Sequence, residues 1–366
     1  MQKLKIAMIG VRGIPATYGG VEKHVEELAV RLVGRGHHVT VFCRSFYTPQ
    51  IKDYKGVKII RLPTINQKHL EMIVHTVMSA LYIAFKRFDI VHVHSIDPAL
   101  VTPLRLFKNR RKIVVTSHGQ AYRRDKWGRL AKNISKMAEK ISMKYSDAIV
   151  SVSRTLKQYY KETYGRDIVY IPNGVEIIEV VNDDVLKKFG LTMKGYILFV
   201  GRLIPTKGCD FLIEAYNSLK TDLKLVIVGG SSHTDEYELK LKGMANENVM
   251  FAGYQYGENL WQLYAHCKLF VFPSEIEGLP IVLLEALSFG VPVVFSDIPE
   301  NMEVAQGIAI SFKNTDVNDL SVKIQDFLTD PSEGEELAVK ARGVIEKKYN
   351  WDSIVDQTEV LYNSIL

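Results

Sequence analysis

Short runs of β-branched and aromatic residues recur along the chain, and a stretch with helical spacing follows most of them. Their hydrophobicity is continuous rather than alternating, which is typical of strands buried on both faces of a parallel sheet. The runs are KIAMIG, HVTVFC, VKIIRL, DIVHVH, KIVVTS, DAIVSVS and IVYIP in the first half, and YILFVG, LKLVIVGG, VMFAGY, LFVFPS, PVVFSD and IAISF in the second. The pattern therefore predicts an α/β protein with helices on both sides of parallel sheets.

The same pattern starts again near residue 195, after a Pro-Asn-Gly turn at residues 172–174. With 366 residues, the chain is long enough for two domains that each bury a full core. We therefore predict two doubly wound, Rossmann-like domains that face each other across a cleft, residues 1–175 and 176–349. Residues 350–366 have the apolar spacing of a final helix, which could close the second domain or cross back to the first.

The two halves of the chain carry opposite charge. Residues 1–180 contain 31 Lys and Arg against 14 Asp and Glu, whereas residues 181–366 contain 16 against 27. The densest basic stretch runs from Arg105 to Lys144 and holds thirteen cations. A basic first half indicates an anionic partner, which could be nucleic acid, an acidic membrane surface or a phosphate-bearing substrate.

Cysteine usage and hydropathy favour a cytoplasmic protein. Cys43, Cys209 and Cys267 are far apart and match no metal spacing, which indicates a reducing compartment. The apolar run at the N-terminus leads directly into a glycine turn and is typical of a first strand rather than a signal peptide. The longest nearly uncharged stretch, Met72 to Phe85, is too short to span a bilayer.

Residues that follow buried strands are the best site candidates, because ligands of open parallel sheets bind at the carboxyl ends of the strands. In the second domain, Arg202 and Lys207 follow one such strand, and two cations there suit a diphosphate. In the first domain, Gly19 and Gly20 end a Gly/Pro-rich loop before a helix, where backbone N–H groups can approach an anion. Simpler explanations stay open, since Lys and Arg are usually solvated and a glycine loop can be an ordinary tight turn.

The stretch SEIEGLPIVLLEA places two carboxylates around a loop and the start of a helix. Glu277 lies in the loop and Glu285 on the second helical turn, with Pro280 in the first turn. Carboxylates accept hydrogen bonds from paired sugar hydroxyls, and the N–H groups of Ile281 and Val282 can bind phosphate. The combination fits a nucleotide diphosphate sugar, although two carboxylates could also be the acid and base of a hydrolase.

Histidines after strands of the first domain are further candidates. His118 lies between Ser117 and Gly119 after a strand, and we predict that it is functional, although such a residue is often a capping or packing residue. His92 and His94 alternate along one strand and face the same side, but no third ligand is near them in the sequence. We therefore predict no metal site.

The stretch PSEIEGLPIVLLEALSFGVPVV resembles the E-x7-E signature of the family 4 glycosyltransferases, which have the GT-B fold. GRLIPTKGCDFLIEAY, DIVHVHS, TSHG, IPNGV and YNWDSIVDQTEVLY are similar to the family in order and approximate spacing. GVRGIPATYGGVEKHVEEL further resembles a bacterial polysaccharide and rhamnosyltransferase subgroup. The resemblance implies retaining sugar transfer, without metal or other cofactor, from a nucleotide diphosphate sugar to a glycan or lipid-linked acceptor in cell-surface polysaccharide synthesis. The subgroup favours UDP or dTDP as the nucleotide.

The resemblance also implies a role for each matching residue. Glu277 would bind hydroxyls of the donor sugar, Glu285 the ribose, and His118 the donor near the reaction centre. The residues that would contact the diphosphate are Arg202, Lys207, Gly278, Leu279, Pro280, Ile281 and Val282, with Gly19 and Gly20 approaching from the other domain. His118, Glu277, Arg202 and Lys207 would be catalytic, and the last helix would return to the first domain. Many family members have Gly at the position of Pro280. Because proline has no backbone N–H group, this chain has one donor fewer there.

We expect the acceptor site on the first domain, where the candidates are Asp97, Tyr122, Arg123, Arg124 and Trp127. The basic stretch could attach the protein to anionic lipid on the inner face of the cell membrane, or it could be a solvated helix face. Three other functions stay open: a nucleotide-sugar epimerase on the same fold, a phosphorylase and a non-catalytic sugar-nucleotide binder. Nucleic-acid binding is disfavoured, because no helix-turn-helix, zinc-finger or RNA-binding sheet motif is present.

Overall fold

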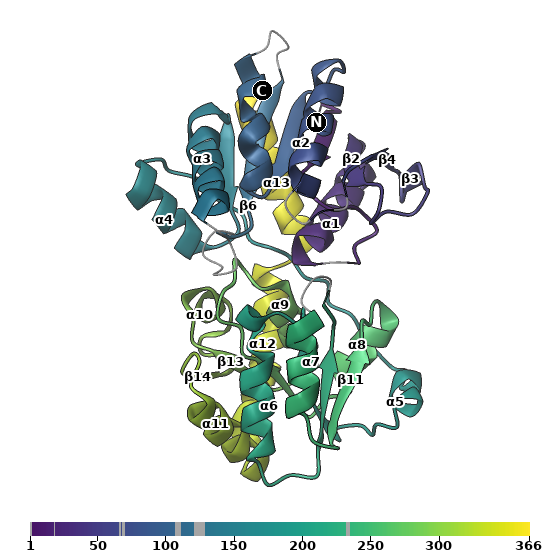
Figure 1. The fold of residues 1–366 in the computed structure, drawn as a ribbon, viewed down its shortest axis with the longest axis vertical. Helices are drawn as coiled ribbons and strands as arrows, with labels where there is room; N and C mark the ends of the chain where they lie inside the picture. The colour runs from purple at the N-terminus through teal and green to yellow at the C-terminus, as the bar shows by residue number, and fades with distance from the viewer. Residues whose placement is uncertain are drawn as a thin grey trace. The chain divides into compact units, whose positions relative to one another are not determined.

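The computed structural model describes residues 2–17, 19–65, 67, 70–106, 111–120, 129–231 and 235–366. The chain divides into two compact units, residues 1–173 with 351–366 and residues 174–350 (Figure 1). Each unit is an α/β body built on one sheet of mostly parallel strands. The two Rossmann-like sheets confirm the fold class that the continuous hydrophobic runs predict.

The first unit is built on an eight-stranded sheet in the order β3-β4-β2-β1-β5-β6-β7-β8. Neighbouring strands pair in parallel, except for the antiparallel pair of β3 and β4. The strands are β1 Lys5–Ile9, β2 His38–Arg44, β3 Asp53–Tyr54, β4 Val57–Leu62, β5 Ile90–His94, β6 Lys112–Ser117, β7 Ala148–Ser151 and β8 Val169–Tyr170. The strand order reverses between β1 and β5, and such a reversal opens a crevice at the carboxyl edge of a sheet.

Helices cover both faces of this sheet. They are α1 Gly20–Gly34, α2 Leu70–Ala84, the 3-10 helix η1 Asp97–Leu106, α3 Arg129–Tyr145, α4 Arg154–Tyr164 and α13 Trp351–Ile365. Right-handed crossovers place α1 on one face and α2, η1 and α3 on the other. The C-terminal helix α13 packs beside α1, and buried residues of both, including Val25 and Val355, share one core with β1 and β2 (Figure 1).

The second unit is built on a six-stranded parallel sheet in the order β11-β10-β9-β12-β13-β14. The strands are β9 Tyr196–Val200, β10 Lys224–Val228, β11 Val249–Gly253, β12 Leu269–Phe272, β13 Val293–Ser296 and β14 Ile310–Phe312. The helices are α5 Asp184–Lys188, η3 Pro205–Lys207, α6 Cys209–Asn217, α7 Asp235–Met244, α8 Glu258–His266, α9 Ile281–Ser288, α10 Pro299–Ala305, α11 Val317–Thr329 and α12 Ser332–Lys348. The strand order is that of a doubly wound nucleotide-binding fold and reverses between β9 and β12.

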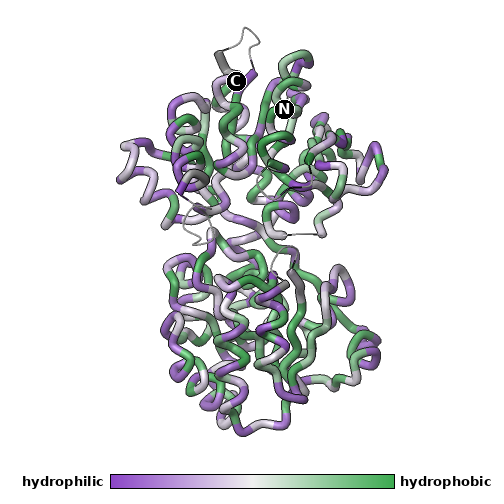
Figure 2. The backbone as a smooth tube through the Cα atoms, viewed as in Figure 1, coloured by the Kyte–Doolittle hydropathy of each residue, from purple (hydrophilic) through white to green (hydrophobic). Residues whose placement is uncertain are grey.

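Burial explains why the strands are continuously apolar. Every residue of β5, β9, β12 and β13 is buried, because helices cover both faces of each sheet. Figure 2 shows the hydrophobic segments gathered along the strands inside each unit. Within the described part of the chain, no helix is both long enough and apolar enough to cross a membrane.

Candidate functional site

The loops that follow β9 and β12 flank the point where the strand order of the second sheet reverses. Ligands of doubly wound sheets bind in the crevice at this point. The loop after β9 contains Arg202 and, in η3, Lys207. The loop after β12 contains Glu277 and leads into α9. The predicted second-domain residues therefore lie at one edge of one sheet.

Gly208 allows these two loops to approach each other closely. Its φ is +64°, and a Cβ atom at this position would lie 2.1 Å from the carbonyl oxygen of Pro273. Two hydrogen bonds to the carbonyl oxygen of Thr206 join the loops, from the N–H of Glu275 at 3.1 Å and from Ser274 Oγ at 3.2 Å. The backbone of one loop thus fixes the position of the other.

Lys207 and Glu277 form an ion pair between the two loops. Both side chains are largely buried, with exposed fractions of 16% for Lys207 and 11% for Glu277. The ammonium also lies 5.9 Å from the ring centroid of Phe272, at the end of β12. From the sequence, Lys207 was predicted to bind the diphosphate and Glu277 the sugar, and their pairing was not predicted.

Helix α9 begins directly after Pro280, which is its N-cap with φ −77° and ψ 107°. The sequence analysis placed Pro280 within the first turn, and this position is wrong by one residue because its ψ is extended rather than helical. Proline has no side-chain acceptor that could cap the first turn. The N–H groups at the helix start, including those of Ile281 and Val282, are therefore suited to an anion.

Glu285 lies on the second turn of α9 and accepts a hydrogen bond of 3.2 Å from the hydroxyl of Tyr264. Tyr264 is fully buried in α8, and its ring stacks on Phe289 with 5.5 Å between centroids. Burial, together with the negative charge of Glu285, raises the pKa of Tyr264 well above its ordinary value. The phenol therefore remains protonated and continues to orient the carboxylate.

The glycine loop of the first unit differs from an open anion cradle. Gly19 is the extended N-cap of α1, which begins at Gly20. The carboxylate of Glu22 accepts a hydrogen bond from the N–H of Arg12 at 3.2 Å. That of Glu26 accepts from the N–H of Ala16 at 2.5 Å. Two loop donors that an anion could have used are thus bonded within the protein, and the sequence analysis missed both glutamates.

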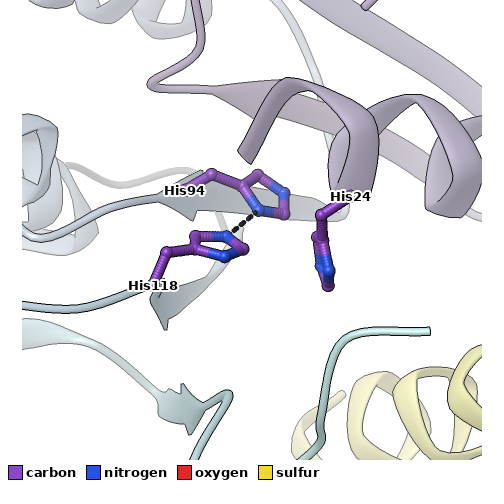
Figure 3. Close-up of side chains that lie close together, drawn as sticks. All are labelled: His24, His94 and His118. Atoms are coloured by element: carbon purple, nitrogen blue, oxygen red, sulfur yellow. Dashed lines mark hydrogen bonds between the residues drawn. The ribbon is translucent and has the colours of Figure 1, made fainter. Parts of the chain in front are cut away.

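Three histidines meet at the carboxyl edge of the first sheet (Figure 3). His24 comes from α1, His94 ends β5 and His118 follows β6. His94 Nδ1 and His118 Nε2 are 3.2 Å apart, and the rings of His24 and His118 meet edge to face with centroids 4.7 Å apart. Ring nitrogens of the three residues, one from each, lie within 4.8 Å of one another.

The ring of His92 packs against that of His94, with centroids 4.1 Å apart, but both of its nitrogens are engaged elsewhere in hydrogen bonds of 2.6 Å. Its Nδ1 pairs with the hydroxyl of Tyr362 and its Nε2 with Thr116 Oγ1. No third ligand lies near His92 and His94 in the sequence, but the fold brings His24 from α1 and His118 from the loop after β6 to His94. His24 could have been found from the sequence, because it lies beside Val25 on the face of α1 that is buried, where a histidine is unusual.

Burial keeps these histidines neutral at neutral pH. Desolvation lowers the pKa of His24 to about 4, although the hydrogen bond that its Nδ1 donates to Asn173 Oδ1 opposes part of this shift. Desolvation and the neighbouring His24 lower the pKa of His92 to about 3. Burial, followed by the charge of neighbouring imidazoles, holds the pKa values of His94 and His118 well below their ordinary range. Unprotonated imidazoles can accept hydrogen bonds or bind a metal ion.

The acceptor-side residues are described only in part. Asp97 is the first residue of η1 and is half-buried. Tyr122, Arg123, Arg124 and Trp127 lie outside the described residues.

Two protein-family models match the chain, one in each half. The model described as Glycosyltransferase Family 4 matches residues 18–178, and the model described as Glycosyl transferases group 1 matches residues 182–359. Both models describe glycosyltransferases, so this chain is a glycosyltransferase. An uncharacterized glycosyltransferase of Methanocaldococcus jannaschii is 28% identical to it over 98% of both chains. The GDP-mannose-dependent alpha-(1-6)-phosphatidylinositol monomannoside mannosyltransferase of Mycolicibacterium smegmatis is 26% identical over 92% of this chain and 93% of its own.

Solved structures share the fold of this glycosyltransferase. Sucrose-phosphate synthase from Thermosynechococcus elongatus matches with a TM-score of 0.86 and 24% identity, and the match covers 99% of both chains. Anabaena HepE in complex with UDP and glucose matches with a TM-score of 0.83 and 17% identity, over 99% of this chain and all of the other. At these identities the likeness shows the GT-B fold alone.

Proposed function

We propose that this glycosyltransferase transfers a sugar, with retention and without a metal cofactor, from a nucleotide diphosphate sugar to a glycan or lipid-linked acceptor in cell-surface polysaccharide synthesis. The observation that carries the proposal is the Lys207–Glu277 pair at the strand-order reversal of the second sheet, beside the start of α9. One edge of one sheet offers a cation, a carboxylate and helix-start N–H groups. These are the partners that a diphosphate and a sugar require.

In this proposal the ion pair exchanges partners when the donor binds. The ammonium of Lys207 pairs with a phosphate oxygen of the donor, and the carboxylate of Glu277 then accepts hydrogen bonds from sugar hydroxyls. The pair keeps both largely buried charges compensated before the donor arrives, so the site does not have to build its geometry during binding. Glu285, oriented by Tyr264, accepts from the ribose hydroxyls.

The leaving diphosphate gains negative charge as the glycosidic bond breaks. Arg202, Lys207 and the N–H groups of Ile281 and Val282 stabilise that charge where it develops. We assign His118 to the donor near the reaction centre, where its neutral imidazole can accept a hydrogen bond. The acceptor hydroxyl attacks from the face of the leaving group, and the departing phosphate assists its deprotonation.

The donor is assigned to the nucleotide diphosphate sugars as a class, with UDP or dTDP sugars favoured. The structural neighbour HepE was solved with UDP and glucose, which supports UDP. The mycobacterial relative is named for GDP-mannose, so GDP sugars belong in the same test. Thermal stabilisation by a panel of UDP, dTDP, GDP and ADP sugars ranks the donors, and stabilisation by none of them contradicts the proposal.

Substitution of Glu277 tests the assignment of roles. Glu277→Gln removes the negative charge that accepts sugar hydroxyls, and a lost charged hydrogen bond of about 1.5–3 kcal/mol lowers kcat/KM roughly 10- to 150-fold. Affinity for the free nucleotide diphosphate should change much less. The matched control is Glu275→Gln on the same loop, which should keep transfer activity. Equal effects of the two substitutions would contradict the role of Glu277.

Product analysis separates transfer from the other functions. A transferase releases nucleotide diphosphate only as sugar appears on an acceptor. An epimerase would return an altered sugar nucleotide without acceptor, and a binding protein would return the donor unchanged. The anomeric configuration of the product, read by NMR coupling constants, tests retention.

We also propose that the first unit docks on an anionic membrane that carries the acceptor. Helix α3 has a row of lysines at four-residue spacing: Lys132, Lys136, Lys140 and Lys144. Helix α2 exposes an apolar row that continues one residue past its end: Leu70, Ile73, Val77, Leu81 and Phe85. Both helices pack against η1. Cations bind acidic headgroups while apolar side chains enter the interface, so the two rows suit a membrane surface.

Vesicle co-sedimentation tests this partner. The protein should bind phosphatidylglycerol-containing vesicles more strongly than phosphatidylcholine vesicles, and salt should weaken the binding. The double variant Lys136→Glu/Lys140→Glu loses two attractive charges and should bind at least about 30-fold more weakly at about 1 kcal/mol per cation. Lys347→Glu/Lys348→Glu in the second unit is the charge-matched control. Binding that ignores lipid charge would contradict the docking proposal.

A further inference from the structure

The histidine cluster of the first unit, defined as His24, His94 and His118, has the composition of a metal-ligand set. The three side chains come from α1, β5 and the loop after β6, and in Figure 3 their rings converge at the sheet edge. Imidazole is a ligand for zinc and for neighbouring divalent transition metals. The expectation of no metal site was based on the residues near His92 and His94 in sequence and on the family resemblance, and His24 was not considered.

Asn173 orients the ring of His24 through a hydrogen bond. His24 Nδ1 lies 2.9 Å from Asn173 Oδ1, and because that oxygen can only accept, Nδ1 carries the proton and leaves the lone pair on Nε2. Metal-binding histidines characteristically donate their other ring N–H to a carbonyl or carboxylate oxygen. Asn173 therefore presents His24 in the tautomer that a metal ion requires.

His94 is the most deeply buried of the three histidines. Its side chain is fully buried, and its Nε2 has no hydrogen-bond partner among the described residues. An ion bound between Nδ1 of His94 and Nε2 of His118 would leave this Nε2 as the protonated nitrogen of the ring. In Figure 3 the three rings lie at the corners of a triangle, and the ring centroid of His94 is 5.5 Å from those of His24 and His118.

The spacing of the nitrogens also suits a small ion. Two nitrogens bound to a tetrahedral zinc at about 2.05 Å lie about 3.3 Å apart. His94 Nδ1 and His118 Nε2 are 3.2 Å apart, so an ion can replace the proton they share with little movement. His118 is only half-buried and offers access from solvent.

We propose that His24, His94 and His118 bind one divalent transition-metal ion of the zinc class, with solvent in the fourth position. The ion inhibits the enzyme, because it occupies the imidazole of His118 that is assigned to the donor. This inhibitory consequence rests on the proposed function, whereas metal binding itself does not.

Metal binding is tested on the full-length protein after treatment with EDTA. Co2+ should give the visible absorption of a four-coordinate ion with one equivalent bound, and Zn2+ should displace it. His94→Gln and His118→Gln should each weaken binding at least about tenfold. Asn173→Ala should weaken it about 10- to 100-fold through the orientation of His24. His38→Gln, at an exposed histidine, is the matched control and should bind as the wild type does.

Circular dichroism in EDTA shows whether each variant is folded. If the variant of the buried His94 does not fold, His118→Gln still tests the site, because His118 is only half-buried. Unchanged Co2+ binding in folded His118→Gln overturns the site, as does the absence of four-coordinate absorption in the wild type. Zn2+ should inhibit transfer in competition with the donor. If Co2+ binding depends on His118 but no sugar is transferred, the site stands and the proposed function fails. If sugar is transferred and no histidine-dependent binding occurs, the site fails alone.

Discussion

Replacement of Gly208 by alanine should separate the two loops that carry Lys207 and Glu277. A Cβ atom there would lie 2.1 Å from Pro273 O, and the φ of +64° is strained for any residue with a side chain. The left-handed conformation costs about 1–2 kcal/mol, and two lost hydrogen bonds to Thr206 O cost about 1 kcal/mol each. The free energy of unfolding of the second unit should therefore fall by about 3–4 kcal/mol.

The matched control is Gly190→Ala in the same unit. Gly190 has a φ of +60°, and no described atom lies within 4 Å of its Cβ position, so only the conformational cost of about 1–2 kcal/mol applies. Urea unfolding followed by circular dichroism gives both values, and calorimetric titration with UDP gives the change in affinity. Gly208→Ala should also weaken nucleotide binding, whereas Gly190→Ala should not. Equal losses of stability in the two variants would refute the argument that Gly208 fixes the approach of the loops.

Three further outcomes follow from the buried groups. The first unit should lose stability as the pH falls from about 6.5 towards 5. In the folded protein the pKa values of His24 and His92 are about 4 and about 3, so these side chains stay unprotonated in this range. In the unfolded chain the same imidazoles are exposed and take up protons, which favours unfolding. Each should contribute up to about 1.4 kcal/mol per pH unit, and an unchanged urea midpoint between pH 7 and 5 would oppose this. The three cysteines are buried, and burial raises the pKa of Cys43 to about 11 and that of Cys267 to about 12, so Ellman's reagent should label them only after unfolding. Tyr264→Phe removes the donor that orients Glu285 and should raise KM for the donor several-fold with little change in kcat, and a fall in kcat alone would count against that role.

Local sequence determined most of the strands, because a strand covered on both faces must be apolar throughout. The run IVYIP is the exception, since only Val169–Tyr170 is paired and Pro172 soon follows. The order of the strands was not predicted, because it depends on contacts between distant segments. Its consequence for the site was predicted, since residues after parallel strands share one edge whatever the order.

Pairwise contacts in the candidate site were beyond the sequence. Lys207 and Glu277 are 70 positions apart, and only the approach at Gly208 makes them partners. His24 lies on a helix rather than after a strand, so the rule that found His118 could not find it. Sequence patterns therefore located the edge of each sheet but not the side chains that meet there.

The return of α13 to the first unit has a topological consequence. The polypeptide begins and ends in the same unit, so residues 174–350 interrupt it as an insert. After cleavage at residue 173, Trp351–Leu366 would be covalently joined only to the second unit. The part of the first core that this helix forms with α1 should then be destabilised, whereas the core of the second unit should not. In sequence the second unit is therefore an insertion within the first, and exchange of residues 174–350 between relatives should leave the fold of the first unit intact.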